Sequence, residues 1–108
     1  MDFNNYQDTI DKFAIYPSSG SGNEQELSYL ALGLGGETGE VLEKTKKLIR
    51  DNRFDKHEVA KELGDVLWYL ARYAKAINYT LDEIAELNVY KLNSRMERNV
   101  LGGSGDNR

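Results

Sequence analysis

Apolar residues recur every three or four positions along most of this chain, which is the spacing of a helix that buries one face. No segment alternates apolar and polar residues over the length of a strand, so the sequence predicts an all-α protein with a four-helix-bundle-like core. Helix boundaries follow from capping residues, glycines and the single proline, Pro17. The predicted helices cover residues 4–16, 24–50 and 56–77, and a fourth runs from 81 to 96 or 98.

Short signals refine the ends of these helices and the segments between them. Asn4 or Asn5 is predicted to cap the first helix, and a capping box begins the fourth at Thr80. Residues 18–23, rich in Ser and Gly, form either a plain connector or a lid over a site. The Gly-rich tail over residues 99–108 is either disordered or folded back over a site. The whole chain, 1–108, is predicted to be one domain, divided into an N-terminal helix and loop (1–23), a helical core (24–98) and the tail (99–108).

The composition narrows the class of protein. A content of 40% hydrophobic and 30% charged residues is typical of a globular domain, and the formal net charge is −4. The chain has no cysteine, which excludes a disulfide framework and a thiolate zinc site and fits a reducing cytoplasm. There is no signal-peptide pattern and no apolar run long enough for a bilayer. Because it is acidic and lacks a basic arm, we expect a cytoplasmic protein with neither a membrane nor duplex nucleic acid as partner.

Four glycines interrupt the composition of the predicted second helix: Gly33, Gly35, Gly36 and Gly39. Each costs about 0.5–1 kcal/mol of helix stability relative to alanine, so together they cost roughly 2–4 kcal/mol. Either another helix backbone or a ligand approaches this face closely, or the helix breaks there. The stretch matches neither a dinucleotide-binding fingerprint nor a P-loop, because no strand precedes it and no lysine follows at the required spacing.

Two acidic pairs, one in each of the two longest predicted helices, are the main candidates for chemistry. Glu37 and Glu40 are three residues apart, as are Glu62 and Asp65, so each pair lies side by side on its helix. Both pairs border apolar stripes, where an uncompensated charge is costly and needs a partner. That partner is either a bound divalent cation or a set of nearby Lys and Arg side chains. Carboxylate oxygens alone suit Mg²⁺, or Mn²⁺, better than zinc, and the only histidine, His57, is expected to be exposed near a turn.

Aromatic and basic residues close to these pairs each have two interpretations. Trp68 and Tyr69 follow the second pair by about one turn, and they either stack on a base or pack in the core. Tyr69 is the stronger candidate for stacking on a nucleotide base. Lys44 and Lys47 lie one to two turns beyond the first pair, and they either meet phosphate charge or pair with carboxylates along the helix.

The predicted fourth helix carries a second group of polar candidates. Asn88 interrupts its apolar stripe and is either a helix–helix hydrogen bonder or a residue that reads a ligand. Lys91 and Arg95, one turn apart, either contact a ligand or form a solvated face. Apolar stripes on all the long predicted helices suggest further burial between subunits. We therefore expect a homo-oligomer, either a dimer or a tetramer, with sites at or near its interface.

The acidic pairs and the residues that follow them resemble the motifs of MazG-like nucleoside triphosphate pyrophosphohydrolases. The shared pattern is Glu37-x-x-Glu40, then Glu62-x-x-Asp65 after twenty-one residues, and later Asn88-x-x-Lys91 with Arg95. The resemblance covers roughly residues 24–108. Many members of that family carry a further glutamate where this chain has Gly36, and Glu43 is the residue that could supplement the set.

The resemblance implies an all-α fold, a homo-oligomer, and hydrolysis of (deoxy)nucleoside triphosphates to the monophosphate and pyrophosphate. It also implies that the acidic pairs hold Mg²⁺, that a carboxylate acts as base, and that the tail closes over the nucleotide. The implied catalytic and metal-binding residues are Glu37, Glu40, Glu62 and Asp65, with Lys44, Lys47, Lys91 and Arg95 on the phosphates and Tyr69 and Asn88 on base or sugar. Two alternatives remain: a non-catalytic helical module for self-association or protein binding, and hydrolysis of a phosphorylated compound that is not a nucleotide.

Overall fold

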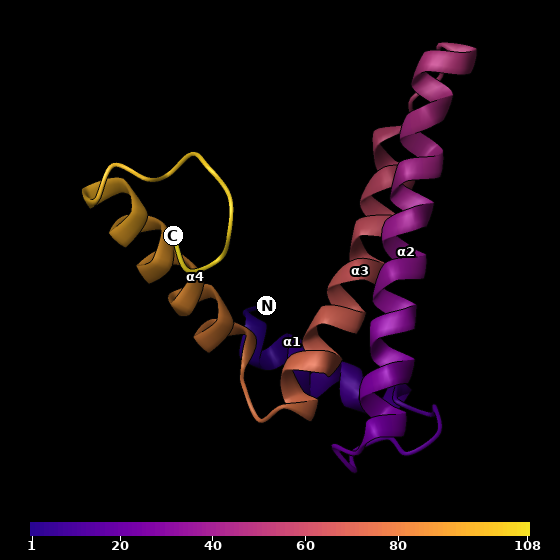
Figure 1. The fold of residues 1–108 in the computed structure, drawn as a ribbon. Helices are drawn as coiled ribbons and strands as arrows, with labels where there is room; N and C mark the ends of the chain where they lie inside the picture. The colour runs from indigo at the N-terminus through magenta and orange to yellow at the C-terminus, as the bar shows by residue number, and fades with distance from the viewer.

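A computed structural model describes all residues, 1–108, and contains helices and no strand (Figure 1). The four α-helices are α1 (Phe3–Ile10), α2 (Glu24–Asp51), α3 (Lys56–Ala76) and α4 (Leu81–Glu97), with a 3₁₀ turn, η1 (Asp11–Phe13), after α1. The predicted all-α class and the four helices are confirmed, but the prediction of a first helix over 4–16 is wrong at its end, because α1 stops at Ile10 and η1 at Phe13. No helix has both the length and the apolar character needed to cross a membrane.

Capping side chains account for the helix starts. Asp2 caps α1, because its carboxylate accepts a hydrogen bond of 2.8 Å from the Asn5 backbone N–H. The predicted caps, Asn4 and Asn5, are wrong, since both residues lie inside the first turn. Asp55 caps α3 in the same way, and the capping box predicted at Thr80 is confirmed at the start of α4.

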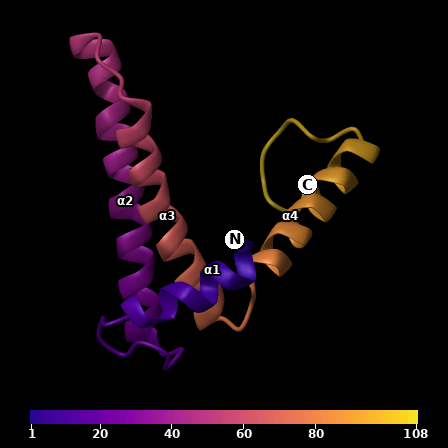
Figure 2. The same ribbon diagram turned by 180° about the vertical axis from the view of Figure 1, so that it is seen from behind.

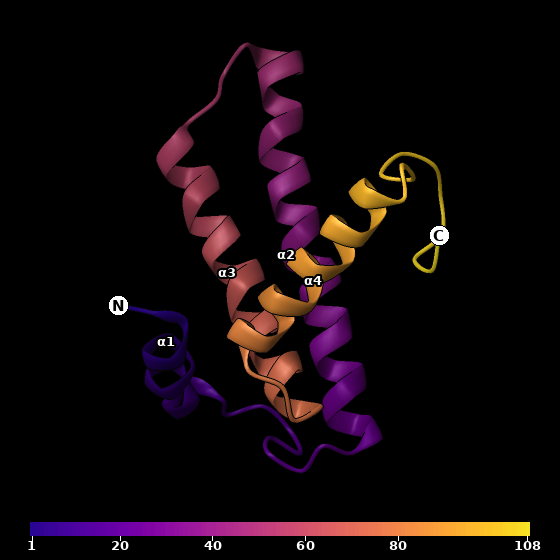
Figure 3. The same ribbon diagram turned by 90° about the vertical axis from the view of Figure 1, so that its left-hand side faces the viewer.

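Only two of the helices pack along their length. α2 and α3 run antiparallel and side by side, joined by the short connection 52–55, and α1 lies across the end where α2 begins (Figures 1 and 2). α4 leaves from that end, touches α1 and α3, and then points away, so its backbone does not approach α2 (Figure 1). Figure 3, viewed from the α4 side, shows the tail turning back along α4. One chain is therefore a helical hairpin with a separate α4 arm, and not a closed four-helix bundle.

The main cluster of buried apolar side chains is small and sits where α1, α3 and the start of α4 meet. Its residues are Ile10, Ala71, Ala74 and Leu81, and Tyr16 and Leu30 are buried outside it. Large apolar side chains remain exposed on both arms of the molecule, among them Leu32, Leu42 and Leu63 on the hairpin and Leu87, Val89, Tyr90 and Met96 on α4. Exposed apolar surface of this extent is typical of a surface that another chain covers.

A buried carboxylate fixes the Ser/Gly-rich segment before α2. Glu26, which is 1% exposed, accepts hydrogen bonds from the Tyr16 hydroxyl at 2.6 Å and from the backbone N–H groups of Gly20 and Gly22, each at 2.8 Å. Burial alone would raise the pKa of Glu26, but these donors and the nearby Arg72 charge outweigh it, so the pKa is lowered. The segment is thereby tied to the start of α2.

α2 continues as a helix through all four of its interior glycines. A Cβ on Gly33 would overlap the ring of Tyr69, so the absence of a side chain makes room for an aromatic residue from α3. Gly35, Gly36 and Gly39 have open space around them within the chain. Close approach therefore explains Gly33, and the helix is not broken at the others.

Candidate functional site

Three carboxylates converge between α2 and α3. Glu37 on α2 and Glu62 and Asp65 on α3 each offer one oxygen, and these oxygens all lie within 4.8 Å of one another. The two helices pack antiparallel along their length, which brings the middle of α2 level with the middle of α3. Glu37 and Glu62 are half-buried and Asp65 is exposed. We call these three residues the acidic cluster.

The fourth predicted carboxylate, Glu40, lies outside the acidic cluster. It is exposed on α2, about one turn after Glu37, and its negative charge helps to raise the Glu37 pKa. Glu43 is an unsuitable supplement, because its carboxylate is paired at 2.8 Å with Lys46 on the exposed side of the helix. The structure therefore gathers three of the four acidic residues that the sequence singles out.

The negative charge of the acidic cluster is only partly compensated within the chain. The pKa of Glu37 is raised by burial and then by the charges of Asp65, Glu62 and Glu40. The nearest cation is Lys44, whose Nζ lies 3.7 Å from a Glu62 carboxylate oxygen. Carboxylates held this closely are stabilised by a cation, and an all-oxygen donor set fits a hard divalent ion such as Mg²⁺. His57 is exposed, as predicted, and takes no part.

Aromatic side chains border the acidic cluster on the side of α1. Tyr69 is half-buried, and its pKa is raised by burial, by neighbouring Tyr29 and by the charges of nearby carboxylates, Glu37 first. Its ring centroid lies 6.4 Å from that of Tyr29 and 5.0 Å from that of Trp68. Trp68 packs against the apolar core, so of its two interpretations the structure supports core packing. Tyr29 was not singled out by the sequence, although Tyr29, Gly33 and Glu37 follow one another at the four-residue spacing of a helix face.

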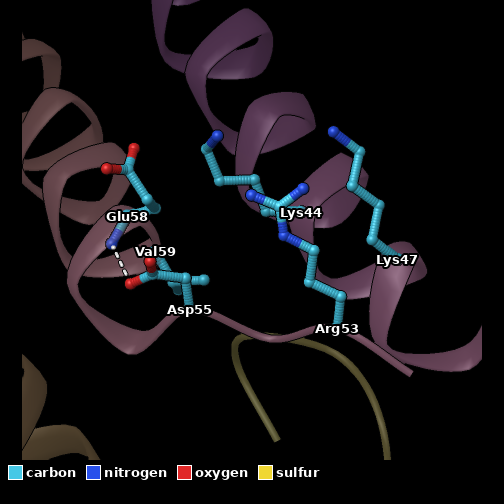
Figure 4. A pocket seen from close by; sticks show the side chains of 6 residues that line it. All are labelled: Lys44, Lys47, Arg53, Asp55, Glu58 and Val59. Carbon is cyan, nitrogen blue, oxygen red and sulfur yellow. Dashed lines mark hydrogen bonds between the residues drawn. The ribbon is translucent and has the colours of Figure 1, made fainter. Parts of the chain in front are cut away.

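A basic pocket lies on the opposite side of the acidic cluster, where α2 ends and α3 begins (Figure 4). Lys44, Lys47 and Arg53 line it together with Asp55, Glu58 and Val59, and we call it the loop-end pocket. The two lysines are predicted site residues. Arg53 is not, because it stands in the connection between the helices, where no periodic pattern indicates which way a side chain points.

The three candidate residues of α4 lie apart from the acidic cluster. Asn88 and Lys91 line an open pocket of about 560 Å³ between α4 and the tail. The Lys91 Nζ lies 2.6 Å from an Asp106 carboxylate oxygen, and the buried Arg95 donates to the same oxygen at 3.0 Å and to the Asp106 carbonyl at 2.7 Å. These two cations, Lys91 first, hold the Asp106 pKa below its usual value. Within one chain the tail thus folds back on α4 and not over the acidic cluster.

Most of this chain is similar to known proteins. The family model of the MazG nucleotide pyrophosphohydrolase domain matches residues 25–100. This range contains the acidic cluster, the loop-end pocket and the candidate residues of α4, from Tyr29 to Arg95. The chain is 41% identical to the Gene 37 protein of Mycobacterium phage L5 over 109 residues, which cover 95% of this chain and 96% of that protein. No solved structure matches the chain.

Proposed function

The chain belongs to the MazG nucleotide pyrophosphohydrolase family, and on that premise we propose that it hydrolyses (deoxy)nucleoside triphosphates to the monophosphate and pyrophosphate in a Mg²⁺-dependent reaction. The observation that carries the proposal is the acidic cluster, in which Glu37, Glu62 and Asp65 bring three carboxylate oxygens within 4.8 Å of one another. Magnesium ions held by carboxylates commonly bridge a protein to substrate phosphates, so this donor set fits the reaction.

Each carboxylate has a role in this proposal. Glu37, Glu62 and Asp65 hold Mg²⁺, or Mn²⁺ in its place, and Glu40 joins them from one turn along α2. The raised pKa of Glu37 fits a group that meets a cation in the working enzyme. The ion supplies neutralisation of the triphosphate charge and activation of a water for attack on the α-phosphorus. One carboxylate of the set accepts the proton of that water.

The remaining candidates bind the substrate. Lys44 and Lys47, next to the acidic cluster, neutralise phosphate charge, and Tyr69 on the other side contacts the base or sugar. This order places the phosphates toward the loop end of the hairpin and the nucleoside toward α1. Lys91 and Arg95 contribute further positive charge from α4. Asn88, which lines the same α4 pocket as Lys91, contacts the base or sugar.

We further propose that the working unit is a homo-oligomer, a dimer or a tetramer. Within one chain, the α4 backbone that carries Lys91 and Arg95 does not approach α2, which carries Glu37. Both arms also expose apolar side chains, for example Leu42 on the hairpin and Tyr90 on α4. If the α4 arm of one chain covers the hairpin of another, both apolar surfaces are buried and the α4 cations reach the acidic cluster. Light scattering coupled to size exclusion measures the state directly, and a monomer at micromolar concentration would contradict it.

The reaction is tested by pyrophosphate release from a panel of deoxynucleoside and ribonucleoside triphosphates with Mg²⁺. We expect chelation by EDTA to abolish release, and Asp65→Asn or Glu62→Gln to lower kcat by about a hundredfold or more, because each removes a ligand. Glu86→Gln, an exposed carboxylate on α4, is the control and should retain activity. Unchanged turnover in Asp65→Asn would show that the site is assigned incorrectly.

One alternative draws on the same exposed apolar faces. A non-catalytic helical module would use them for self-association or for a protein partner. It predicts no Mg²⁺-linked stabilisation, whereas the pyrophosphohydrolase should melt at a higher temperature with Mg²⁺ and a nucleotide. A flat thermal shift across metals and nucleotides would favour the module.

A further inference from the structure

We propose that the loop-end pocket is the subsite for the pyrophosphate part of the substrate, and that Arg53 is a substrate-binding residue within it. The inference rests on the proposed function and extends it to a residue outside the acidic pairs. At about 60 Å³, the pocket is far smaller than the space a nucleoside needs, and Val59 is its one apolar residue. A small, charged pocket of this kind suits a compact anion.

The acidic side chains around the pocket already have partners. Asp55 caps α3, and its carboxylate accepts hydrogen bonds from the backbone N–H groups of His57 at 3.0 Å and Glu58 at 3.1 Å. The Glu58 carboxylate lies 3.3 Å from the Lys61 Nζ. Asp51, at the end of α2, is paired at 2.8 Å with Arg50.

The basic side chains, in contrast, lack close ion-pair partners, although the Arg53 charge helps to lower the Asp55 pKa. Neither Lys47 nor Arg53 makes an ion pair or a side-chain hydrogen bond within the chain, and Lys44 has only its 3.7 Å pairing with Glu62. Lys44 and Lys47 are half-buried, so they are less solvated than ordinary surface lysines. The lining carries three positive charges against the two negative charges of Asp55 and Glu58, and Glu58 is already paired with Lys61 outside the pocket. This leaves a local excess of positive charge in an acidic protein, and a polyanion would supply the missing partners.

The pocket also adjoins the acidic cluster. Lys44 lines the pocket and at the same time pairs with Glu62, and Glu62 is one helical turn beyond Glu58 on α3. In Figure 4 the side chains of Lys44, Lys47 and Arg53 rise from the loop end of the hairpin in the same direction. A phosphate chain that leaves the metal ligands along the hairpin therefore enters this pocket next.

The backbone fixes where Arg53 stands. Asn52 ends α2 in the left-handed conformation, with φ 51°, and the N–H groups of Asn52 and Arg53 both donate to the Lys47 carbonyl. This closing turn holds Arg53 at the end of the helix that carries the two lysines. A planar guanidinium placed there suits bidentate contact with a phosphate better than a third lysine would. The competing explanation is that Arg53 only complements the dipole at the end of α2, as Arg50 does.

The test is calorimetric binding of inorganic pyrophosphate and of a nucleoside monophosphate, both with Mg²⁺, to wild type, Arg53→Gln, Arg53→Lys and Arg50→Gln. We expect Arg53→Gln to weaken pyrophosphate binding about tenfold or more, because it removes a hydrogen-bonded charge contact. Monophosphate binding should stay within about twofold. Arg53→Lys should fall between wild type and Arg53→Gln, and Arg50→Gln, the matched control, should bind like wild type. Arg53 makes no side-chain contact that the fold needs, so these variants should unfold like wild type.

The proposal is overturned if Arg53→Gln binds pyrophosphate as tightly as wild type, or if it weakens both ligands equally. Equal effects of Arg53→Gln and Arg50→Gln would also overturn it, since that pattern is expected of a dipole contribution alone. Failure of the reaction gives a different result. If wild type releases no pyrophosphate from any triphosphate but binds inorganic pyrophosphate in an Arg53-dependent way, the anion site stands and the proposed hydrolysis does not.

Discussion

Replacing Glu37 with glutamine is expected to change stability in opposite directions with and without Mg²⁺. Without metal, the half-buried Glu37 carboxylate stands beside those of Glu62 and Asp65, its pKa is raised, and it has no ion-pair partner. Removing its charge relieves repulsion and should stabilise the fold. With Mg²⁺ bound, the same substitution removes a ligand and should cost stability relative to wild type.

The size of the effect follows from the cluster geometry. Two unit charges 4.8 Å apart repel by about 1 kcal/mol at the dielectric constant of water, and by more in a half-buried site. Glu37 has two such neighbours, but salt and the exposure of Asp65 reduce the sum. We therefore expect metal-free Glu37→Gln to be more stable than wild type by about 1–2 kcal/mol. Mg²⁺ at about 100 times its Kd should stabilise wild type by roughly 2.7 kcal/mol and the variant by much less.

The assay is urea unfolding followed by the fluorescence of Trp68, at neutral pH and one chain concentration, in EDTA and across a Mg²⁺ titration. The concentration is held fixed because assembly would add to the apparent stability. Glu86→Gln should follow wild type in both conditions. Glu40→Gln measures whether the carboxylate outside the acidic cluster also contributes. The reasoning fails if Glu37→Gln is less stable than wild type in EDTA, or if it gains as much from Mg²⁺ as wild type does.

Three further predictions concern the surroundings of the site. Glu26→Gln should lower the unfolding free energy by about 1.5–3 kcal/mol in urea, because charge-assisted hydrogen bonds are lost, while exposed Glu24→Gln changes it little. Gly33→Ala should displace the Tyr69 ring and destabilise the fold in a thermal melt, in spite of the better helix propensity of alanine. Asp106 has a pKa lowered by Lys91 and Arg95, so its ionised form binds them. The tail should be fully attached above the pKa of an unfolded aspartate, and it should detach as pH falls through the lower pKa that Asp106 has in the folded protein. NMR shifts of the tail amides measure this change, and Asp106→Asn should show the shifts of a detached tail already at neutral pH.

The helices were predictable from the sequence because their signals are local. Capping chemistry at Thr80 and the apolar spacing on α2 and α3 act within one or two turns, and the structure confirms those elements. At the start of α1, Asp2, Asn4 and Asn5 are all good capping residues, and only the hydrogen bond that the Asn5 backbone N–H donates to the Asp2 carboxylate decides among them. Local chemistry therefore fixes an element and leaves its first residue uncertain.

Side chains that join distant parts of the chain were harder to predict. Glu26 reads as an ordinary first-turn acid, and only the fold brings Tyr16 and two loop N–H groups against it. Tyr29 becomes relevant because the hairpin sets it against Tyr69. Arg53 has no pattern at all, since a connection between helices has no period. In each case the residue or its partner lies in an irregular segment or on another helix, and the pattern of one helix does not identify it.

The direction of α4 was not predictable for a different physical reason. The connections 52–55 and 77–80 are equally short, so connection length does not explain why α3 packs along α2 while α4 points away from α3. The acidic cluster follows from the packing of α2 against α3 along their length, whereas α4 can pack on any apolar surface that matches its stripe. Its apolar residues indicate that a face is buried, but not whether the covering surface belongs to the same chain. The carboxylates thus depend on contacts within one hairpin, whereas the meeting of Lys91 and Arg95 with them depends on what covers α4, and the oligomeric state is the measurement that separates the two.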